Sequence, residues 1–377
     1  MTVPASAGHP DLARFVAAGA AAGRWPGGVY AVGAPGDVPR FLGAEGALAL
    51  EPEREEANVD ALYDLASLTK PLALALVLLR LADRGAVDLD RPLDDLLPEL
   101  RGYAGRTPSF ADLLTHSSGL PAWAPLYRLA ARPEDVVAAI AALPPAAAAG
   151  TAAIYSCVGA IAATIALRRG TKSGLRALFE REVGGPLGLG KDEMLFSPLP
   201  QVLASRAAPT ERGRAREAEL AGGDSSRADV PGPDEPLRGV VHDGNCRWLG
   251  GDAGNAGLFG TARAVFRVAS ALLEPGALLS AKALARAATP AAGLAGDART
   301  FGFRSGADAG PAGKPLGRDA FGHSGFTGTS VWIAPRRGLV AALLTNRVHP
   351  RWREAPTEIW RGEFNAIAAR VAEEAGR

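Results

Sequence analysis

The sequence predicts an α/β protein in which strands near both ends of the chain enclose a mostly helical middle. Short runs bounded by Gly and Pro, typical of strands, occur at 28–33 and 40–50 and again at 329–334 and 338–345. From position 67 to about 200 the pattern is instead that of Leu- and Ala-rich helices. With 47% hydrophobic residues among 377, the chain can also fill a sizeable core.

The elements of the N-terminal half follow in order. A helix at 10–23 precedes the first two strands. A helix from Ser67 to about Gly85 carries Pro71 in its first turn, where proline is tolerated, and ends at a glycine that can take the left-handed closing conformation. The further helices are expected at 109–116, 134–143, 157–169 and 172–183.

In the C-terminal part, a Gly-rich stretch at 250–260 is followed by another helix. The two late strands are joined by residues 335–337, which predicts a hairpin. The tail at 355–375 has the pattern of an amphipathic helix, and we expect it to pack against that hairpin.

These elements predict a division of the chain into three parts. Residues 1–85 and 240–377 form a discontinuous α/β sheet domain, and residues 86–204 form a mostly helical domain. Residues 205–239 are expected to be an exposed loop or linker, because they are rich in charged residues, Gly and Pro and contain few large apolar side chains.

Charge and hydropathy narrow the classes of partner. The 41 Lys and Arg nearly balance the 40 Asp and Glu, so a net charge of +1 gives no reason to expect nucleic acid or an anionic membrane, and a small molecule fits better. The longest apolar run, 71–79, is too short to span a bilayer. No signal peptide is evident, so we expect a cytoplasmic protein, or a periplasmic or secreted one if a leader was trimmed. The oligomeric state is left open.

The pair Ser67 and Lys70 is the first chemical candidate. In a helix, positions i and i+3 lie on one face, about 5 to 6 Å apart at Cβ, so the hydroxyl and the ammonium can meet. A serine needs a base to become a nucleophile, and a partly desolvated lysine can serve. Alone, the pair is equally well read as a helix N-cap followed by a solvated lysine.

More of the chain resembles one family. Residues 62–71, with the sequence LYDLASLTKP, resemble the nucleophile motif of the serine β-lactamase and penicillin-binding protein superfamily, especially its class C and esterase-like branch. Five further segments follow in the family's order: 112–120, the Tyr-x-Asn position at 155–157, 186–190, the Gly-rich segment 250–261, and 322–328 in place of the Lys-Thr-Gly strand motif. The resemblance covers about residues 25–350.

The resemblance implies an antiparallel sheet flanked by helices, with a mostly helical domain across an active-site cleft. It implies that Ser67 attacks the substrate, that Lys70 accepts or relays the proton, and that Tyr155 shares the acid/base role. The oxyanion hole would be formed by the backbone N–H groups of Ser67 and Phe326. Substrate would be bound along an edge strand and at the Tyr-x-Asn position, by residues Cys157, His323, Ser324 and Gly325.

Two departures from the family pattern bear on the substrate. Cys157 stands where the family has an amide that bonds the lysine and the substrate, and a thiol is only a weak donor and acceptor. His323 replaces the family's lysine and is mostly neutral at pH 7 unless its pKa is perturbed, which weakens binding of a carboxylate. Both changes favour esters over β-lactams.

Other chemistries fit less well. Residues 322–326, GHSGF, lack the final glycine of an α/β-hydrolase elbow and precede a strand. The five histidines, at 9, 116, 242, 323 and 349, lack zinc-site spacing, and the glycines at 251, 254 and 257 are wrongly spaced for a dinucleotide. Neither metal nor cofactor is therefore expected. No histidine is placed beside Cys157 by the sequence, so we expect a buried, inert thiol there rather than a nucleophile.

The sequence thus predicts a serine hydrolase that acts on a small ester, amide or β-lactam through an acyl-enzyme on Ser67, with esters favoured. The alternatives are a D-Ala-D-Ala carboxypeptidase or D-aminopeptidase, and a ligand-binding or sensing homologue that has lost turnover.

Overall fold

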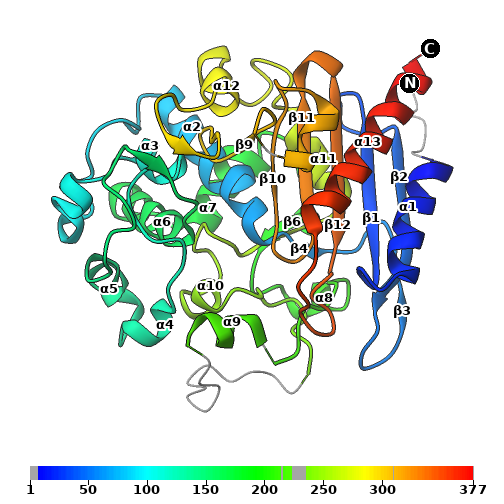
Figure 1. The fold of residues 1–377 in the computed structure, drawn as a ribbon, viewed down its shortest axis with the longest axis horizontal. Helices are drawn as coiled ribbons and strands as arrows, with labels where there is room; N and C mark the ends of the chain where they lie inside the picture. The colour runs from blue at the N-terminus through cyan, green and yellow to red at the C-terminus, as the bar shows by residue number, and fades with distance from the viewer. Residues whose placement is uncertain (1–6, 214, 223–234, 309, 377) are drawn as a thin grey trace.

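The computed structural model contains a seven-stranded antiparallel sheet that combines strands from both ends of the chain (Figure 1). It describes residues 7–213, 215–222, 235–308 and 310–376. The strand order is β3-β2-β1-β12-β11-β10-β9. The strand bounds are β1 (Gly27–Gly33), β2 (Phe41–Ala49), β3 (Glu55–Glu56), β9 (Arg304–Ser305), β10 (Phe321–Ser324), β11 (Ser330–Ala334) and β12 (Leu339–Thr345).

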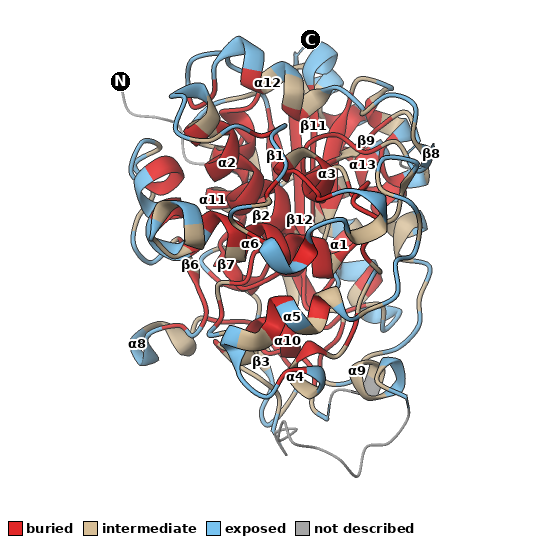
Figure 2. Ribbon diagram, turned by 90° about the vertical axis from the view of Figure 1, so that its left-hand side faces the viewer, coloured by how far each residue is buried: buried red, intermediate tan, exposed pale blue. Residues whose placement is uncertain are grey.

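Both faces of the central strands β1, β12 and β11 are buried, and the alternation along β12 shows why. Successive side chains of a strand point to opposite faces. Residues 339, 341 and 343 pack with α1 (Pro10–Ala21) and α13 (Thr357–Gly376). Residues 340, 342 and 344 belong to the other core, which contains α11 (Ala262–Ser270) and α2 (Leu76–Asp83). Figure 2 shows the sheet, α2 and α11 largely buried. The expected α/β class is confirmed, and so are the C-terminal hairpin and the tail helix that packs on it.

A mostly helical region lies beside the sheet. Its helices are α3 (Phe110–Leu114), α4 (Leu126–Leu129), α5 (Val136–Ala141), α6 (Cys157–Thr171), α7 (Leu175–Phe179) and the π-helical η6 (Glu180–Gly184), whereas α8 (Gln201–Ala204) lies apart, below the sheet in Figure 1. The helix expected at 172–183 starts three residues later, at Leu175, because Lys172 after α6 takes a left-handed conformation with φ 58°; α7 then runs directly into η6. Two further helices, α10 (Gly244–Trp248) and α12 (Ala281–Ala288), come from the later chain.

Two small sheets bring the motif segments together. The first has the order β4-β7-β6 and joins β4 (Tyr63–Asp64), just before Ser67, to the Gly-rich segment at β7 (Leu258–Gly260) and to β6 (Met194–Phe196). In the second, β5 (Ala152–Ala153) pairs in parallel with β8 (Ala295–Gly296). This pairing places the chain before Tyr155 next to the chain that leads to Arg299.

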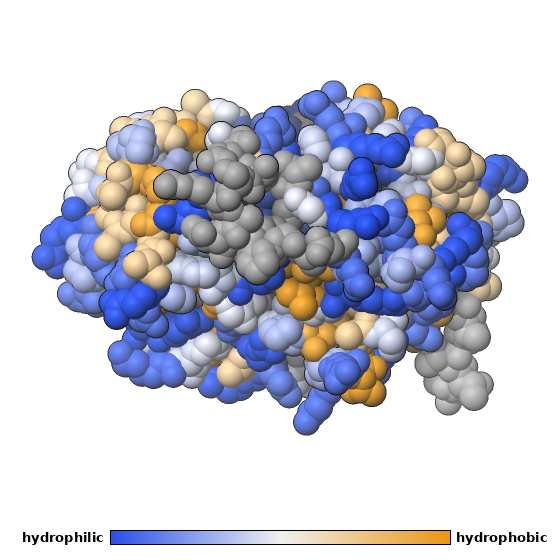
Figure 3. Space-filling model, turned by 90° about the horizontal axis from the view of Figure 1, so that it is seen from below, coloured by the Kyte–Doolittle hydropathy of each residue, from blue (hydrophilic) through white to orange (hydrophobic). Residues whose placement is uncertain are grey.

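The prediction of an exposed loop at 205–239 is wrong for residues 207–211, whereas most of the other described residues in this range are exposed or half-buried. Residues 207–211 are buried, and the Ala208 N–H bonds the Leu62 carbonyl at 2.8 Å, so this stretch packs beside β4. A short helix, α9 (Ala215–Leu220), follows. Residues 223–234 lie outside the described residues. The face that carries α8 and α9 is mostly hydrophilic, with apolar side chains in small separate groups (Figure 3). Composition missed the buried stretch because small residues such as Ala207 can be buried without any large apolar side chain.

Candidate active site

Ser67 lies in a strained turn between β4 and a continuous helical segment. The chain passes through a 3₁₀ turn, η1 (Ala66–Leu68), a π-helical stretch, η2 (Lys70–Ala75), and then α2. Ala66 has φ 46°, a left-handed conformation that costs about 1–2 kcal/mol for a residue with a side chain. Asp64 holds this turn, since its two carboxylate oxygens accept the Ala66 N–H at 2.8 Å and the His242 N–H at 2.7 Å. The turn presents Ser67 half-buried at the end of the segment.

Lys70 is completely buried, yet its ammonium group is fully paired. Its Nζ atom donates to Ser67 Oγ at 3.0 Å, to Cys157 Sγ at 3.5 Å and to the Asn255 carbonyl at 2.9 Å. An ammonium has three hydrogens, so these three acceptors account for all of them. Burial lowers the pKa of Lys70, but the neighbouring Cys157 and Tyr155 raise it, and the net pKa lies above the ordinary value. The resting side chain is therefore a cation.

Tyr155, which lies just before α6, contacts Ser67 from the side of the helical region. Its hydroxyl donates to Ser67 Oγ at 2.7 Å. Ser156, the next residue, caps α6 by accepting the Gly159 N–H at 2.8 Å, and this fixes where Tyr155 enters. Burial of the hydroxyl raises the pKa of Tyr155. Ser67 Oγ thus accepts from both groups, and its own proton is free to leave toward one of them only after that group has lost a proton.

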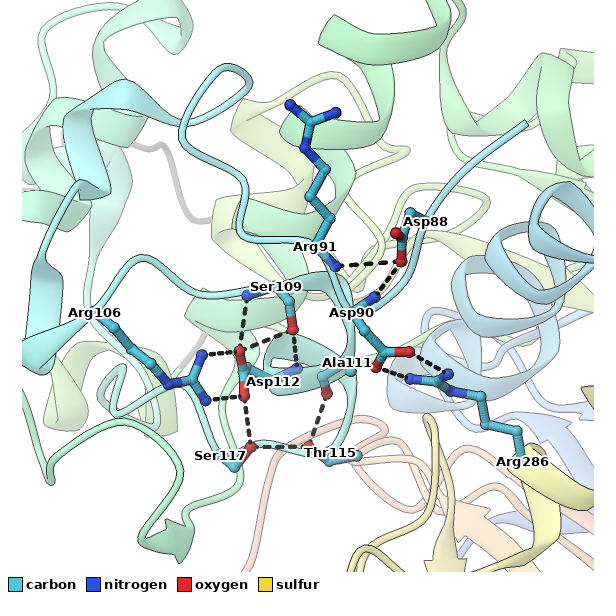
Figure 4. Close-up of polar contacts among 10 residues, drawn as sticks. All are labelled: Asp88, Asp90, Arg91, Arg106, Ser109, Ala111, Asp112, Thr115, Ser117 and Arg286. Atoms are coloured by element: carbon cyan, nitrogen blue, oxygen red, sulfur yellow. Dashed lines mark hydrogen bonds and ion pairs between the residues drawn. The ribbon is translucent and has the colours of Figure 1, made fainter. Parts of the chain in front are cut away.

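A polar network around α3 supports Tyr155 indirectly. Asp112 accepts two hydrogen bonds of 2.6 Å from Arg106 and caps α3 together with Ser109, as Figure 4 shows. This network fixes the loop that carries His116, which has φ 61°. The His116 ring packs on Tyr155 with centroids 4.8 Å apart, and its Nδ1 accepts the Ser156 N–H at 3.1 Å. Burial lowers the pKa of His116 well below its ordinary value, so the ring is neutral.

The residues of β10 form the facing wall. His323 is buried, its Nδ1 contacts the Ser324 carbonyl at 2.9 Å, and its Nε2 has no partner among the described residues. Burial lowers the pKa of His323 well below its ordinary value. The expectation of an edge strand is corrected, because β9 pairs outside β10. However, β9 reaches only Phe321 and Gly322, so its two residues do not cover the end of β10 that carries the motif.

The two expected oxyanion-hole donors are brought to one place by close packing. Gly325 lies against the Ser67 turn so tightly that a Cβ there would come within 2.6 Å of the Leu65 carbonyl. The hydroxyls of Thr327 and Thr329 bond the carbonyls of Asp64 and Leu65 at 2.7 and 3.1 Å. Within the described chain, neither the Ser67 N–H nor the Phe326 N–H makes a hydrogen bond.

A cavity of about 380 Å³ opens above Ser67. Cys157 and His323 line it, and Trp123, Leu220 and the 38% exposed Phe326 give it apolar wall.

The expected site residues gather around this cavity. The structure brings Ser67, Lys70 and Tyr155 into mutual contact. The cavity wall also contains Phe326 and the expected substrate-binding residues, which are Cys157, His323, Ser324 and Gly325.

The expectation that Cys157 is buried is corrected, while its expected inertness stays a prediction. This thiol is only partly buried, lines the cavity and lies against Lys70, because it occupies the start of α6 next to Tyr155. Cys246, by contrast, is buried, and its Sγ donates to the Ala256 carbonyl at 3.2 Å. Both cysteines are free.

Several cavity residues carried no signal in the sequence. Of the described residues that line the cavity, five are arginines and two are acidic, which makes the wall cationic. Among them, Arg299 is 6% exposed, lies 5.2 Å from the Tyr155 ring, and has Nε and Nη1 without partners in the described chain. Asn255, whose carbonyl holds Lys70, and Glu217 of α9 are also part of the wall. Asn255 lies in the Gly-rich segment, whose pattern does not indicate a contact with the lysine.

The sequence profile of the family described as Beta-lactamase matches residues 12–363. The chain belongs to the Beta-lactamase family. The resemblance seen in the motifs to the serine β-lactamase and penicillin-binding protein superfamily is thereby confirmed. No set of three or more His, Cys, Asp and Glu side chains arranged to hold a metal occurs in the described part of this family member. Among its described helices, none is long and apolar enough to cross a membrane.

Two relatives are similar in sequence. An N-acetylmuramyl-L-alanine amidase of Bacillus subtilis (strain 168) is 26% identical over 313 residues, which span 76% of this chain and 68% of the relative. Esterase EstB of Burkholderia gladioli is 47% identical over 68 residues, a segment that spans 17% of each protein.

Solved structures show the same fold. A penicillin-binding protein homologue from Caulobacter crescentus superposes with a TM-score of 0.73 at 20% identity, covering 97% of this chain and 99% of its own. EstCE1, described as a hydrolase with promiscuous acyltransferase activity, superposes with a TM-score of 0.72 at 20% identity, covering 96% of this chain and 97% of its own.

Proposed function

We propose that this member of the Beta-lactamase family is an esterase that cleaves small esters through an acyl-enzyme on Ser67. The observation that carries the proposal is the convergence of Lys70 and Tyr155 on one hydroxyl, at 3.0 and 2.7 Å, beneath an open cavity. A serine with an adjacent acid/base pair is the arrangement that nucleophilic catalysis requires.

The chemistry begins from the form of the site in which the Lys70–Tyr155 pair lacks one proton. Ser67 Oγ forms a bond to the ester carbonyl carbon while its proton passes to this pair. The carbonyl oxygen becomes an oxyanion and accepts hydrogen bonds from the N–H groups of Ser67 and Phe326. When the intermediate collapses, the C–O bond to the alcohol breaks and the pair returns the proton to the departing oxygen. Water then repeats the sequence on the acyl-enzyme.

Two features of the site favour esters over amides and β-lactams. The thiol of Cys157, at 3.5 Å from Lys70, occupies the position from which an amide side chain would bond a substrate amide. The neutral, buried His323, with its lowered pKa, supplies no charge for a substrate carboxylate. EstB and EstCE1, which are named as an esterase and a hydrolase, lend support by similarity.

A peptidase of the D-Ala-D-Ala carboxypeptidase or D-aminopeptidase type is the second candidate. It is favoured by the amidase relative, which matches over most of this chain, and by the cationic cavity wall, which suits a peptide carboxylate.

The test is covalent labelling followed by turnover. The protein is incubated separately with a fluorophosphonate and a penicillin, and the adduct is located by intact mass and peptide mapping. We expect fluorophosphonate on Ser67, hydrolysis of p-nitrophenyl esters that Ser67→Ala abolishes, and slower turnover of D-Ala-D-Ala peptides and cephalosporins. No adduct at Ser67 with either reagent would refute a serine hydrolase. An adduct without turnover of any ester, peptide or β-lactam would identify a sensing protein instead.

A further inference from the structure

A buried arginine from the C-terminal helix reaches the expected oxyanion hole. Arg361, in the second turn of α13, is only 6% exposed. Its Nη2 donates to the Gly325 carbonyl at 2.8 Å. The opposite side of the guanidinium is held on its own helix, where Nη1 donates to the Thr357 hydroxyl at 3.0 Å and to Glu358 Oε1 at 2.9 Å.

The carbonyl that Arg361 binds belongs to the peptide unit that carries the Phe326 N–H. A peptide unit is planar and trans, so its C=O and N–H point in opposite directions and are oriented together. The same Gly325 oxygen also accepts the Gly328 N–H at 3.1 Å. Both lone pairs of this oxygen are therefore used, and the plane of the peptide cannot rotate without breaking one of the two hydrogen bonds.

The positive charge of Arg361 strengthens the Phe326 N–H as a hydrogen-bond donor, in addition to fixing its direction. A charge-assisted hydrogen bond is shorter and stronger than a neutral one. Polarising a peptide at its carbonyl strengthens the hydrogen bond that its N–H donates, and the effect is larger away from water. Arg347 differs in this respect, since it bonds the carbonyl of Phe326, which belongs to the following peptide unit, at 3.2 Å.

We propose that Arg361 is a positioning residue of the oxyanion hole, which orients and polarises the Gly325–Phe326 peptide so that the Phe326 N–H stabilises the oxyanion. The inference rests on the proposed function, because it assigns a role within acyl transfer at Ser67. Glu358 contacts the guanidinium from the other side and also pairs with Arg304 at 3.0 Å.

The experiment compares Arg361→Met, Arg361→Lys and the control Glu358→Gln by p-nitrophenyl ester kinetics and by infrared spectroscopy of the acyl-enzyme labelled with ¹³C at its carbonyl. Methionine fills the space without a charge, and lysine keeps the charge. The Glu358→Gln change weakens the ion pair on the far side of the guanidinium but leaves the bond to Gly325 in place.

Removal of a whole oxyanion donor costs about 10²–10³ in kcat, so weakening one should lower kcat about tenfold or more in Arg361→Met, with KM nearly unchanged. The acyl carbonyl band should move to higher frequency, because a weaker hydrogen bond leaves more double-bond character in the carbonyl. Arg361→Lys should recover part of kcat, and Glu358→Gln should stay close to wild type in both readouts. Thermal melting establishes that each variant is folded.

The inference is overturned if folded Arg361→Met keeps the wild-type kcat and carbonyl band, or if Glu358→Gln loses as much kcat as Arg361→Met. If Arg361→Met does not fold, Arg361→Lys decides, since its shorter reach must shift the band if the proposal holds. Failure of the wild-type protein to acylate at Ser67 would instead refute the proposed function itself.

Discussion

Replacing Tyr155 by phenylalanine separates the chemical role of this residue from its structural role. The change removes only the hydroxyl that donates to Ser67 Oγ at 2.7 Å. The ring keeps its neighbours, with the His116 centroid at 4.8 Å, Lys70 Nζ at 4.9 Å and the Arg299 guanidinium at 5.2 Å. One lost hydrogen bond costs about 0.5–1.5 kcal/mol of stability, which in a chain of this size lowers Tm by only a few degrees.

The catalytic cost should be much larger. A positioned acid/base group contributes about 10²–10⁴ to the rate, which corresponds to about 2.7–5.5 kcal/mol of barrier. We therefore expect kcat for p-nitrophenyl acetate to fall at least a hundredfold in Tyr155→Phe, and the rate of fluorophosphonate labelling to fall by a similar factor. Cys157→Ala serves as the matched control, because it removes a contact to Lys70 rather than to Ser67 and should keep ester hydrolysis. A folded Tyr155→Phe protein with kcat within tenfold of wild type would refute the acid/base role.

Three other expectations follow from the charges around the site. The pKa values of Lys70 and Tyr155 both lie above their ordinary values, so the form of the pair that lacks one proton is scarce at neutral pH. We therefore expect kcat/KM to rise about tenfold per pH unit from pH 6 to 8. A kcat/KM that does not change with pH would contradict this. His116 and His323 are buried and neutral, and their pKa values are lowered in the folded protein. As the pH falls, these two histidines therefore bind protons in the unfolded chain before they do so in the folded one. Below about pH 6.5 each should cost up to about 1.4 kcal/mol of unfolding free energy per pH unit in urea melts. Because the buried His349 also has a lowered pKa, His116→Asn should remove one of three such contributions to the slope. Arg299 lines the cavity, and two of its nitrogens have no partner in the described chain. Arg299→Gln should therefore raise KM about tenfold or more for an ester that carries a carboxylate, and leave KM for the uncharged analogue of that ester unchanged. Equal effects on both esters would exclude recognition of an anion by Arg299.

Much of the fold could be predicted because its signals are local. The strands at 28–33 and 338–345 are marked by their composition and by flanking Gly and Pro, and the structure places them at 27–33 and 339–345 as direct neighbours in the sheet. The two- and three-residue strands could not be found in this way. A pair such as Arg304–Ser305 is a strand only because β10 lies beside it.

The candidate site was predictable where residues are close in sequence or belong to a motif. Ser67 and Lys70 are three positions apart, and Tyr155 was located by the family's motif order. Arg299 and Arg361 were not found, since a contact across a fold leaves no spacing to read, and the chain has many arginines to choose from. The motif order also places Cys157 at the substrate site, but only the tertiary structure shows that its thiol is partly exposed there and lies against Lys70.

The complete burial of Lys70 also has a practical consequence for handling the protein. The chain has five lysines, and the other four, Lys172, Lys191, Lys282 and Lys314, are all exposed and lie outside the cavity lining. Among the lysines, reagents that react with amines will therefore modify these four surface positions. Lys70 is shielded from such reagents by its burial and by its charge. The protein can be immobilised through these lysines with the Lys70 amine left intact.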